Sequence, residues 1–271
     1  MRRTGVVGVL LAASLTACTP ADTLTTTTAS ASTNTVGQRA TVTWIYDGDT
    51  IEVEGGNGAL DVRLVGINAP DHGECFYQEA TDHLIDTLKG RQVRLEVVGE
   101  DQFDRQLAVV WHGERLVSLE LVSLGLAIAV TPEDPNDRLL IDAEETAFQT
   151  GAGLWAADAC GTGVLPQIEI DDSGLVADPP GPDVETLDGE VVVLVNRGAA
   201  AVDLTGWVLR DESSRHRYRF TPGSMIGPGA EVTIRSSDPG WDPGDSAVWN
   251  NGGDMVLLLD GGGRVIARLR Y

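Results

Sequence analysis

The sequence lacks any apolar stretch that approaches the roughly 20 residues of a transmembrane helix. The apolar run at residues 6–15 follows Arg2 and Arg3, and it is too short to cross a bilayer as a lasting helix. We therefore interpret residues 1–17 as a signal peptide and expect an exported protein.

The signal peptide would leave Cys18 as the first mature residue. Residues 15–18, Leu-Thr-Ala-Cys, resemble the lipobox of bacterial lipoproteins, in which the cysteine thiol carries the lipid. Each buried acyl CH₂ group contributes about 0.8 kcal/mol, so we expect Cys18 to anchor the protein to the outer face of the membrane. An ordinary signal peptide, with Cys18 lost or left free, is the alternative. The Thr-, Ser- and Ala-rich residues 18–37 are expected to form a flexible tether.

Cysteine is scarce, with three in the chain. Once Cys18 is assigned to the lipid, only Cys75 and Cys160 remain, and an oxidising compartment favours their pairing. We predict a Cys75–Cys160 disulfide. Two isolated cysteines without a companion histidine cluster supply too few ligands for a structural zinc site.

Basic residues are also few, with 19 Lys and Arg against 41 Asp and Glu, a net charge of -22. Residues 38–162 alone contain 8 basic and 23 acidic residues. Because neutralisation of phosphates normally supplies nonspecific affinity for nucleic acid, this composition argues against a broad basic binding face. Any handling of nucleic acid would depend on a few positioned arginines and a cation.

The fold class expected from the patterning is mainly β, in two domains. Residues 38–162 alternate like strands, with helical segments between and after them, which suits a five-stranded barrel of the oligonucleotide/oligosaccharide-binding (OB) type. In residues 163–271 helical periodicity disappears and turn signals recur, as in a β-sandwich. The strands predicted in the barrel are residues 42–46, 50–53, 60–67, 92–98 and 107–111, with helices at 79–88, 116–124 and 137–150. The strands predicted in the sandwich are residues 191–195, 207–209, 217–220, 231–235, 255–259 and 265–268.

Carboxylates and arginines gather at the ends of predicted barrel strands, in residues 47–50 (Asp-Gly-Asp-Thr), 63–71 and 101–105. Carboxylate and amide oxygens hold hard cations such as Ca²⁺, and guanidinium groups match the geometry of phosphate oxygens. The mixture therefore points to phosphoryl chemistry.

These three segments, in this order, resemble the staphylococcal nuclease family over about residues 40–155. The resemblance implies a Ca²⁺-dependent nuclease acting on DNA or RNA. It makes Asp49 a calcium ligand, with Asp47 a supporting carboxylate near it. Arg63 and Arg105 would bind the scissile phosphate and its transition state.

Two positions depart from the family pattern. Asn68 stands where the family has a second aspartate ligand, so calcium should bind more weakly, and Ala69 can still offer its main-chain carbonyl. Asp71 stands where the family has its glutamate general base, and the loss of one methylene shortens its reach. Glu74 or His72 could take over that task. The phosphate-contacting tyrosine of the family is also missing near residues 129–131.

Each site residue also has a structural interpretation. Asp47-Gly48 is a common hairpin turn. Arg63 could form a surface ion pair with Asp61 or Glu52, and Arg105 could pair with Asp101. Among the remaining polar residues, we expect a solvated helix face at Glu144 and Glu145 and noncatalytic roles for His72 and His83.

The C-terminal segment, about residues 167–271, resembles the lamin-tail domain, an immunoglobulin-like sandwich. Trp207, Trp241 and Trp249 are expected in its core rather than in a ligand-binding stripe. Alternate arginines at residues 215–219 could touch nucleic acid or an anionic envelope polymer, and a solvated strand face is the interpretation we favour.

Two functional hypotheses remain. The first is an extracytoplasmic, monomeric Ca²⁺-dependent nuclease, and the second is a binding or scaffold lipoprotein that has kept the nuclease fold with weakened catalysis. Dependence of phosphodiester cleavage on calcium, Arg63 and Arg105 separates them.

Overall fold

The computed structural model describes residues 37–56, 58–132, 138–161, 163–182, 185–242 and 247–271. The predicted signal peptide, Cys18 and the tether up to residue 36 lie outside the described residues. No helix in the described ranges combines the length and apolar character that a membrane crossing requires.

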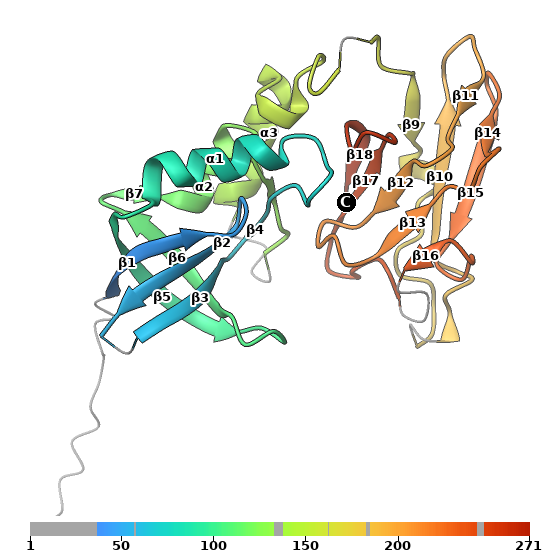
Figure 1. Cartoon of the computed structure of the whole chain (residues 1–271). Coiled ribbons are helices and arrows are strands. Elements are labelled where there is room, and N and C mark those ends of the chain that lie inside the picture. The colour runs from blue at the N-terminus through green and yellow to red at the C-terminus, as the bar shows by residue number, and fades with distance from the viewer. Residues whose placement is uncertain (1–36, 57, 133–137, 162, 183–184, 243–246) are drawn as a thin grey trace, which may run out of the picture. The chain divides into compact units, whose positions relative to one another are not determined.

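Five strands close into the predicted barrel, drawn blue to green in Figure 1. They are β1 (Gln38–Ile45), β2 (Thr50–Gly55), β3 (Gly58–Leu64), β5 (Gln92–Glu100) and β6 (Gln106–His112). Antiparallel pairing links β3, β2, β1, β5 and β6 in that order, and a parallel pairing of β3 with β6 completes the circle. The expectation of a five-stranded OB-like barrel is confirmed.

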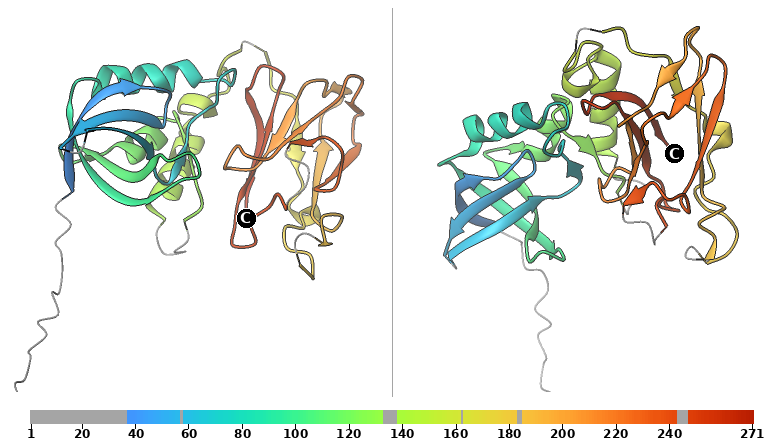
Figure 2. Two further views of the ribbon diagram at one scale, coloured as in Figure 1. Left: turned by 60° about the horizontal axis from the view of Figure 1, so that its bottom comes forward. Right: turned by 45° about the vertical axis from the view of Figure 1, so that its right-hand side comes forward.

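Three helices and several short elements complete the barrel domain. They are α1 (Tyr77–Leu88), α2 (Val117–Ser123), α3 (Leu139–Thr150), η1 (Gly153–Trp155), β4 (Ile67–Asn68), β7 (Arg115–Leu116) and β8 (Ile128–Ala129). Helix α1 lies along the barrel in both views of Figure 2 because Ala80, Leu84 and Leu88, spaced by one helical turn, are buried in the barrel core. Strand β4 pairs with β8, which fixes Asn68 opposite Ile128.

The first strand differs from its predicted alternation. The register of β1 against β2 shifts between Val42 and Trp44, so Val42 and Ile45 are buried while Trp44 is 51% exposed. The Trp44 ring lies outside the barrel, 4.4 Å beneath the amino group of Lys89.

The C-terminal domain is a sandwich whose two larger sheets share one core. Its elements are β9 (Ile168–Ile170), η2 (Asp172–Gly174), β10 (Val191–Asn196), β11 (Val202–Asp203), β12 (Val208–Arg210), β13 (Arg217–Arg219), β14 (Met225–Ile226), β15 (Glu231–Arg235), β16 (Trp241–Asp242), β17 (Met255–Leu259) and β18 (Val265–Arg270). One sheet has the order β15-β10-β9 and the other β16-β13-β12-β17-β18, with β11 and β14 as a separate pair. Strands β9, β11, β14 and β16, each of two or three residues, were not among the predicted strands.

The three tryptophans of the sandwich are buried in its core, as predicted. The rings of Trp241 and Trp249 meet edge to face with centroids 5.7 Å apart, a favourable aromatic geometry. Trp207 lies in the same cluster.

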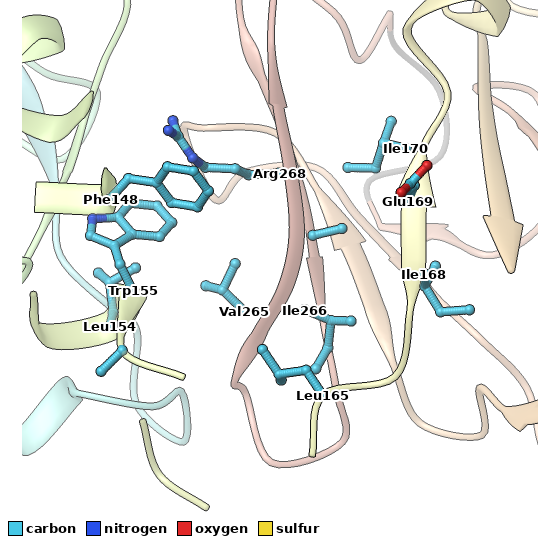
Figure 3. A pocket seen from close by; sticks show the side chains of 12 residues that line it. Phe148, Leu154, Trp155, Leu165, Ile168, Glu169, Ile170, Val265, Ile266 and Arg268 are labelled. Atoms are coloured by element: carbon cyan, nitrogen blue, oxygen red, sulfur yellow. The ribbon is translucent and has the colours of Figure 1, made fainter. Parts of the chain in front are cut away.

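The barrel domain and the sandwich share a small apolar cluster. Its buried members are Ile128, Ala147, Leu154 and Trp155 from the first domain and Met255 and Leu257 from the second. Beside it, a groove of about 330 Å³ has Phe148 and Trp155 on one wall and β18 and β9 on the other (Figure 3). The Arg268 guanidinium lies 3.7 Å from the Phe148 ring centroid.

Helix α3 has one acidic residue in a position that the sequence did not predict. Glu144 was expected on a solvated face, but it is 1% exposed. Its Oε1 accepts the Ala129 backbone N–H at 2.9 Å, and its Oε2 accepts Arg270 Nη2 of the sandwich at 2.9 Å. Glu145 is half exposed and pairs with Arg268 at 2.6 Å.

Candidate active site

A tight turn between β1 and β2 presents Asp49. The Asp47 carboxylate oxygen Oδ1 accepts the backbone N–H groups of Asp49 at 3.0 Å and Thr50 at 2.7 Å, which holds the turn. Gly48 packs so closely on helix α1 that a Cβ there would lie 2.6 Å from the Cβ of Ala80. The turn therefore requires glycine, and Asp47 supports Asp49 through the backbone.

Barrel closure brings the two predicted phosphate-binding arginines into one cluster. Arg63 on β3 lies opposite Thr50 on β2 and opposite Leu107 on β6, two residues beyond Arg105. Arg63 Nη1 donates to Asp49 Oδ1, which also accepts the Thr50 hydroxyl at 3.1 Å. Arg105 Nη1 donates to that hydroxyl oxygen at 3.3 Å. Asp49 and Thr50 thus link the two guanidinium groups.

The loop before β6 orients Arg105. The Asp101 oxygen Oδ1 accepts the backbone N–H groups of Phe103 at 2.9 Å and Arg105 at 3.1 Å, and Oδ2 accepts Arg105 Nε at 2.8 Å. Desolvation opposes these hydrogen bonds, but together they lower the pKa of Asp101 from its ordinary value. Arg105 therefore forms the ion pair with Asp101 that the structural alternative predicted, and its guanidinium also reaches the Thr50 hydroxyl.

The oxygens of Asp49 and Asn68 converge on the same guanidinium. Asn68 Oδ1 accepts Arg63 Nη2 at 2.6 Å, while Asp49 Oδ2 accepts the Ala69 backbone N–H at 2.7 Å. Asp49 is 2% exposed, and burial raises its pKa to about 6 even though the neighbouring Arg63 charge lowers it. A buried carboxylate beside an amide oxygen is therefore a place where positive charge is stabilised.

An oxygen-only donor set suits a hard cation such as Ca²⁺. The described residues contain no group of three or more His, Cys, Asp or Glu side chains arranged to hold a metal. The ligands that the family resemblance implies, the Asp49 carboxylate, the Asn68 amide oxygen and the Ala69 main-chain carbonyl, are all oxygens of the kind that calcium would accept, with one formal charge among them. Such a site predicts modest affinity.

Asp71, in the family's general-base position, has a side chain that is 54% exposed. Its Oδ2 accepts Arg217 Nη2 of the sandwich. The proposed substitute Glu74 is buried, and its Oε1 lies 2.7 Å from Arg217 Nη1 and 3.4 Å from Arg210 Nε. Burial opposes the effect, yet these two guanidinium groups hold the pKa of Glu74 below its ordinary value. Glu74 is therefore an ion-pair partner and a poor proton acceptor.

Sequence reasoning missed the sandwich residues at this site. Asn68 Nδ2 donates to the Glu212 carbonyl oxygen at 3.1 Å and to Ser214 Oγ. Near the position where the family has its tyrosine, Thr131 donates its N–H and hydroxyl to the Glu212 carboxylate at 2.7 and 2.8 Å. Arg217 was expected on a solvated face, and its contacts with barrel carboxylates correct that expectation. The basic character of residues 215–219 was the sequence signal that could have indicated these contacts. The partners of Arg217, however, lie more than 140 residues away in the chain.

A disulfide joins Cys75, just before α1, to Cys160, with their Cα atoms 5.7 Å apart. The Cys75 backbone N–H donates to Gly263 O in the β17–β18 turn at 3.2 Å. The disulfide therefore lies where the barrel domain meets the sandwich.

Comparison with known proteins agrees with this geometry. The family model "staphylococcal nuclease homologue" matches residues 61–157, and that of the lamin tail domain matches residues 167–271. The thermonuclease of Staphylococcus intermedius is 30% identical over 134 residues, which cover 46% of this chain and 80% of that protein. This chain belongs to the staphylococcal nuclease family.

Other relatives share the same region. An uncharacterized endonuclease of Haemophilus influenzae is 37% identical over 113 residues, covering 41% of this chain and 63% of that protein. A probable endonuclease of Pyrenophora tritici-repentis is 30% identical over 112 residues, covering 36% of this chain and 41% of that protein. The chain thus spans less than two thirds of the length of these two family members.

Proposed function

We propose that this protein is a calcium-dependent nuclease that hydrolyses phosphodiester bonds of DNA or RNA outside the cytoplasm. The observation that carries the proposal is the cluster of Arg63, Asp49, Thr50 and Arg105 at one end of the barrel. Two guanidinium groups linked through a carboxylate and a hydroxyl form a compact anion-binding site next to oxygen donors for a cation. The names of the relatives, endonuclease and thermonuclease, support the same activity.

The chain's residues have separate tasks in such a reaction. Arg63 would exchange its contacts with Asp49 and Asn68 for phosphate oxygens, and Arg105, held by Asp101, would bind the same phosphate from the β6 side. Both charges oppose the negative charge that grows in the transition state. Calcium, held by Asp49, Asn68 and Ala69, would polarise the phosphate and help position an attacking water.

Asp71 would accept a proton from the attacking water. Its Oδ2 is bound by Arg217, while its Oδ1 has no hydrogen-bond donor among the described residues. A half-exposed carboxylate with one anchored oxygen can receive a proton on the other.

The deciding experiment is cleavage of denatured DNA by residues 38–271 with Ca²⁺. We expect cleavage that stops on chelation and falls about 10²- to 10³-fold in Arg63→Ala and in Arg105→Ala, because each removes a transition-state donor. Arg39→Ala, on an exposed part of β1, is the matched control and should cleave like the parent. Metal-independent cleavage, unchanged in both site variants, would favour the scaffold hypothesis.

The extracytoplasmic location has its own test. A lipid adduct on Cys18, detected by mass spectrometry, should accompany membrane fractionation, and Cys18→Ser should release the protein from membranes. Membrane association that survives Cys18→Ser would contradict lipid anchoring at this residue.

A further inference from the structure

The loop between β12 and β13 of the sandwich reaches the nuclease site of the barrel. Two of its polar groups, the Glu212 carbonyl and the Ser214 hydroxyl, accept hydrogen bonds from the Asn68 amide. Asn68 is 4% exposed, so these contacts replace water for its NH₂ group. Ser214 has a left-handed backbone, with φ of 61°, at the point of contact.

These contacts determine which end of the Asn68 amide faces the cation site. An asparagine side chain has an acceptor oxygen and a donor nitrogen, and rotation by half a turn exchanges them. In the present orientation Oδ1 faces Arg63 and Nδ2 faces two acceptors. The opposite orientation would put Oδ1 against the Glu212 carbonyl and the NH₂ against a guanidinium, and both pairs repel. A carboxylate, with two equivalent oxygens, would need no such orientation.

The same loop leads into β13, where Arg217 holds Asp71. Its guanidinium bridges Asp71 Oδ2 and Glu74 Oε1, and Glu74 Oε2 in turn accepts the Asp71 backbone N–H at 3.0 Å. Glu74 is itself fixed by the buried Arg210. Both the side chain and the backbone of Asp71 are therefore held by a network that ends in the sandwich.

We propose that three residues of the sandwich, Glu212, Ser214 and Arg217, form a positioning element for the nuclease site. The Glu212 carbonyl and Ser214 orient the Asn68 oxygen toward the cation, and Arg217 fixes Asp71. Asn68 and Asp71, two positions at which this chain departs from the family pattern, thus receive support from the second domain. The inference rests on the proposed function, because it assigns these residues to that reaction.

Calcium binding tests the Asn68 part without any turnover. Titration of the full exported chain, by calorimetry with Ca²⁺ or by Tb³⁺ luminescence, should show about threefold to tenfold weaker binding in Ser214→Ala, the usual effect of one neutral hydrogen bond. Ser214→Gly removes the same hydroxyl without a left-handed Cβ and should give the same weakening. Ser213→Ala is the matched control, because the Ser213 hydroxyl contacts Asp211 within the sandwich.

A double substitution distinguishes a loss of Asn68 amide orientation from a general loosening of the calcium site. In an Asn68→Asp background, Ser214→Ala should change the calcium affinity less than twofold, because a carboxylate presents an oxygen in either orientation. Equal weakening in both backgrounds, or unchanged affinity in Ser214→Ala and Ser214→Gly, would overturn the orienting role.

Kinetics test the Asp71 part. Arg217→Ala should lower kcat about tenfold or more with little change in KM, because Asp71 acts on the water and not on substrate binding. Arg217→Lys, which keeps the charge but not the fork, should fall between parent and alanine variant, and it also serves if the alanine variant does not fold. Arg219→Ala, on the exposed side of β13, is the control. A higher kcat in the Arg217 variants would overturn positioning and show that the segment blocks the site.

The two proposals fail in different ways. Calcium binding that depends on Ser214 in a protein without cleavage would reject the nuclease function and keep the orienting role. Calcium-dependent cleavage that is unaffected by substitutions at Ser214 and Arg217 would keep the nuclease and reject the positioning element.

Discussion

The barrel and the sandwich differ in where their arginines find partners. In the barrel, Arg63 pairs with Asp49 and Arg105 pairs with Asp101, so both ion pairs form within one domain. In the sandwich, four arginines pair with carboxylates of the other domain: Arg210, Arg217, Arg268 and Arg270. The acidic barrel, which has few arginines of its own, is therefore partly neutralised by arginines of the sandwich.

The largest effect on this pairing is expected from Glu144→Ala. It removes a buried acceptor and leaves Arg270 and the Ala129 N–H without that partner, so the free energy of unfolding should fall by about 3 kcal/mol. Glu145→Ala, on the exposed side of the same helix, should cost less than about 1 kcal/mol. Denaturant unfolding measures both losses of unfolding free energy. Equal losses in the two variants would show that a buried carboxylate partner of the sandwich contributes no more than an exposed one.

A pH-dependent effect of similar size is expected at Asp254, whose carboxylate lies inside the sandwich. Burial and the nearby charges of Glu212 and Asp211 raise its pKa to about 7, against hydrogen bonds from the backbone N–H groups of Glu212 and Asn250. A raised folded-state pKa favours folding below pH 4, and this contribution is lost as the pH rises through about 7. Relative to Asp254→Asn, the parent should lose roughly 3 to 4 kcal/mol of unfolding free energy between pH 4 and pH 8, because a pKa difference of one unit corresponds to about 1.4 kcal/mol.

The measurement for Asp254 is a series of denaturant curves for both proteins across that range. Titrations remote from Asp254 are common to parent and variant, so the trend in the difference reports on Asp254 and the acidic neighbours coupled to it. A flat difference would mean that Asp254 is already ionised at pH 4 and that the acidic cluster of the sandwich is fully compensated by its hydrogen bonds.

The smallest effect is expected at Arg268, which stacks on aromatic rings of the barrel domain. Its guanidinium lies 3.7 Å from the Phe148 centroid and 5.2 Å from that of Trp155. Arg268→Lys keeps the charge but loses planar stacking, and the midpoint of thermal unfolding should reflect a loss of about 1 kcal/mol. Arg197→Lys, in an exposed pair with Glu169, should leave that midpoint unchanged. If Arg268→Lys is as stable as the parent, the stacking of Arg268 on Phe148 and Trp155 adds nothing beyond its positive charge.

The barrel and its arginine cluster could be predicted because their determinants are local. The Asp-Gly-Asp-Thr turn contains its own hydrogen-bond donors and acceptors, and barrel closure follows from strand order, so Arg63 and Arg105 meet once the fold is known. The roles of Asp47 and Gly48 are also local. Asp47 bonds backbone groups two and three residues away, and Gly48 packs against the adjacent helix α1.

The sandwich contribution could not be predicted because it depends on pairs that are distant in the chain. Asn68 and Ser214 are 146 residues apart, and Glu144 and Arg270 are 126 apart. Helical spacing places Glu144 on the same face as the buried Ile141 and Ala147, but it does not show that Arg270 from the other domain will pair with this carboxylate. Trp44 shows the same limit at short range, because one shift in strand register moved it to the outside.

The disulfide has a consequence for how firmly the sandwich loop is presented to the barrel. Cys75 lies four residues after Asp71, and Cys160 lies eight residues before β9 begins at Ile168. The disulfide therefore gives a short covalent path from Asp71 to the first strand of the sandwich, in addition to the longer path along the main chain. A short covalent connection keeps the loop between β12 and β13 at a high effective concentration beside Asn68 and Asp71. After any transient separation the loop returns to these partners in a unimolecular step.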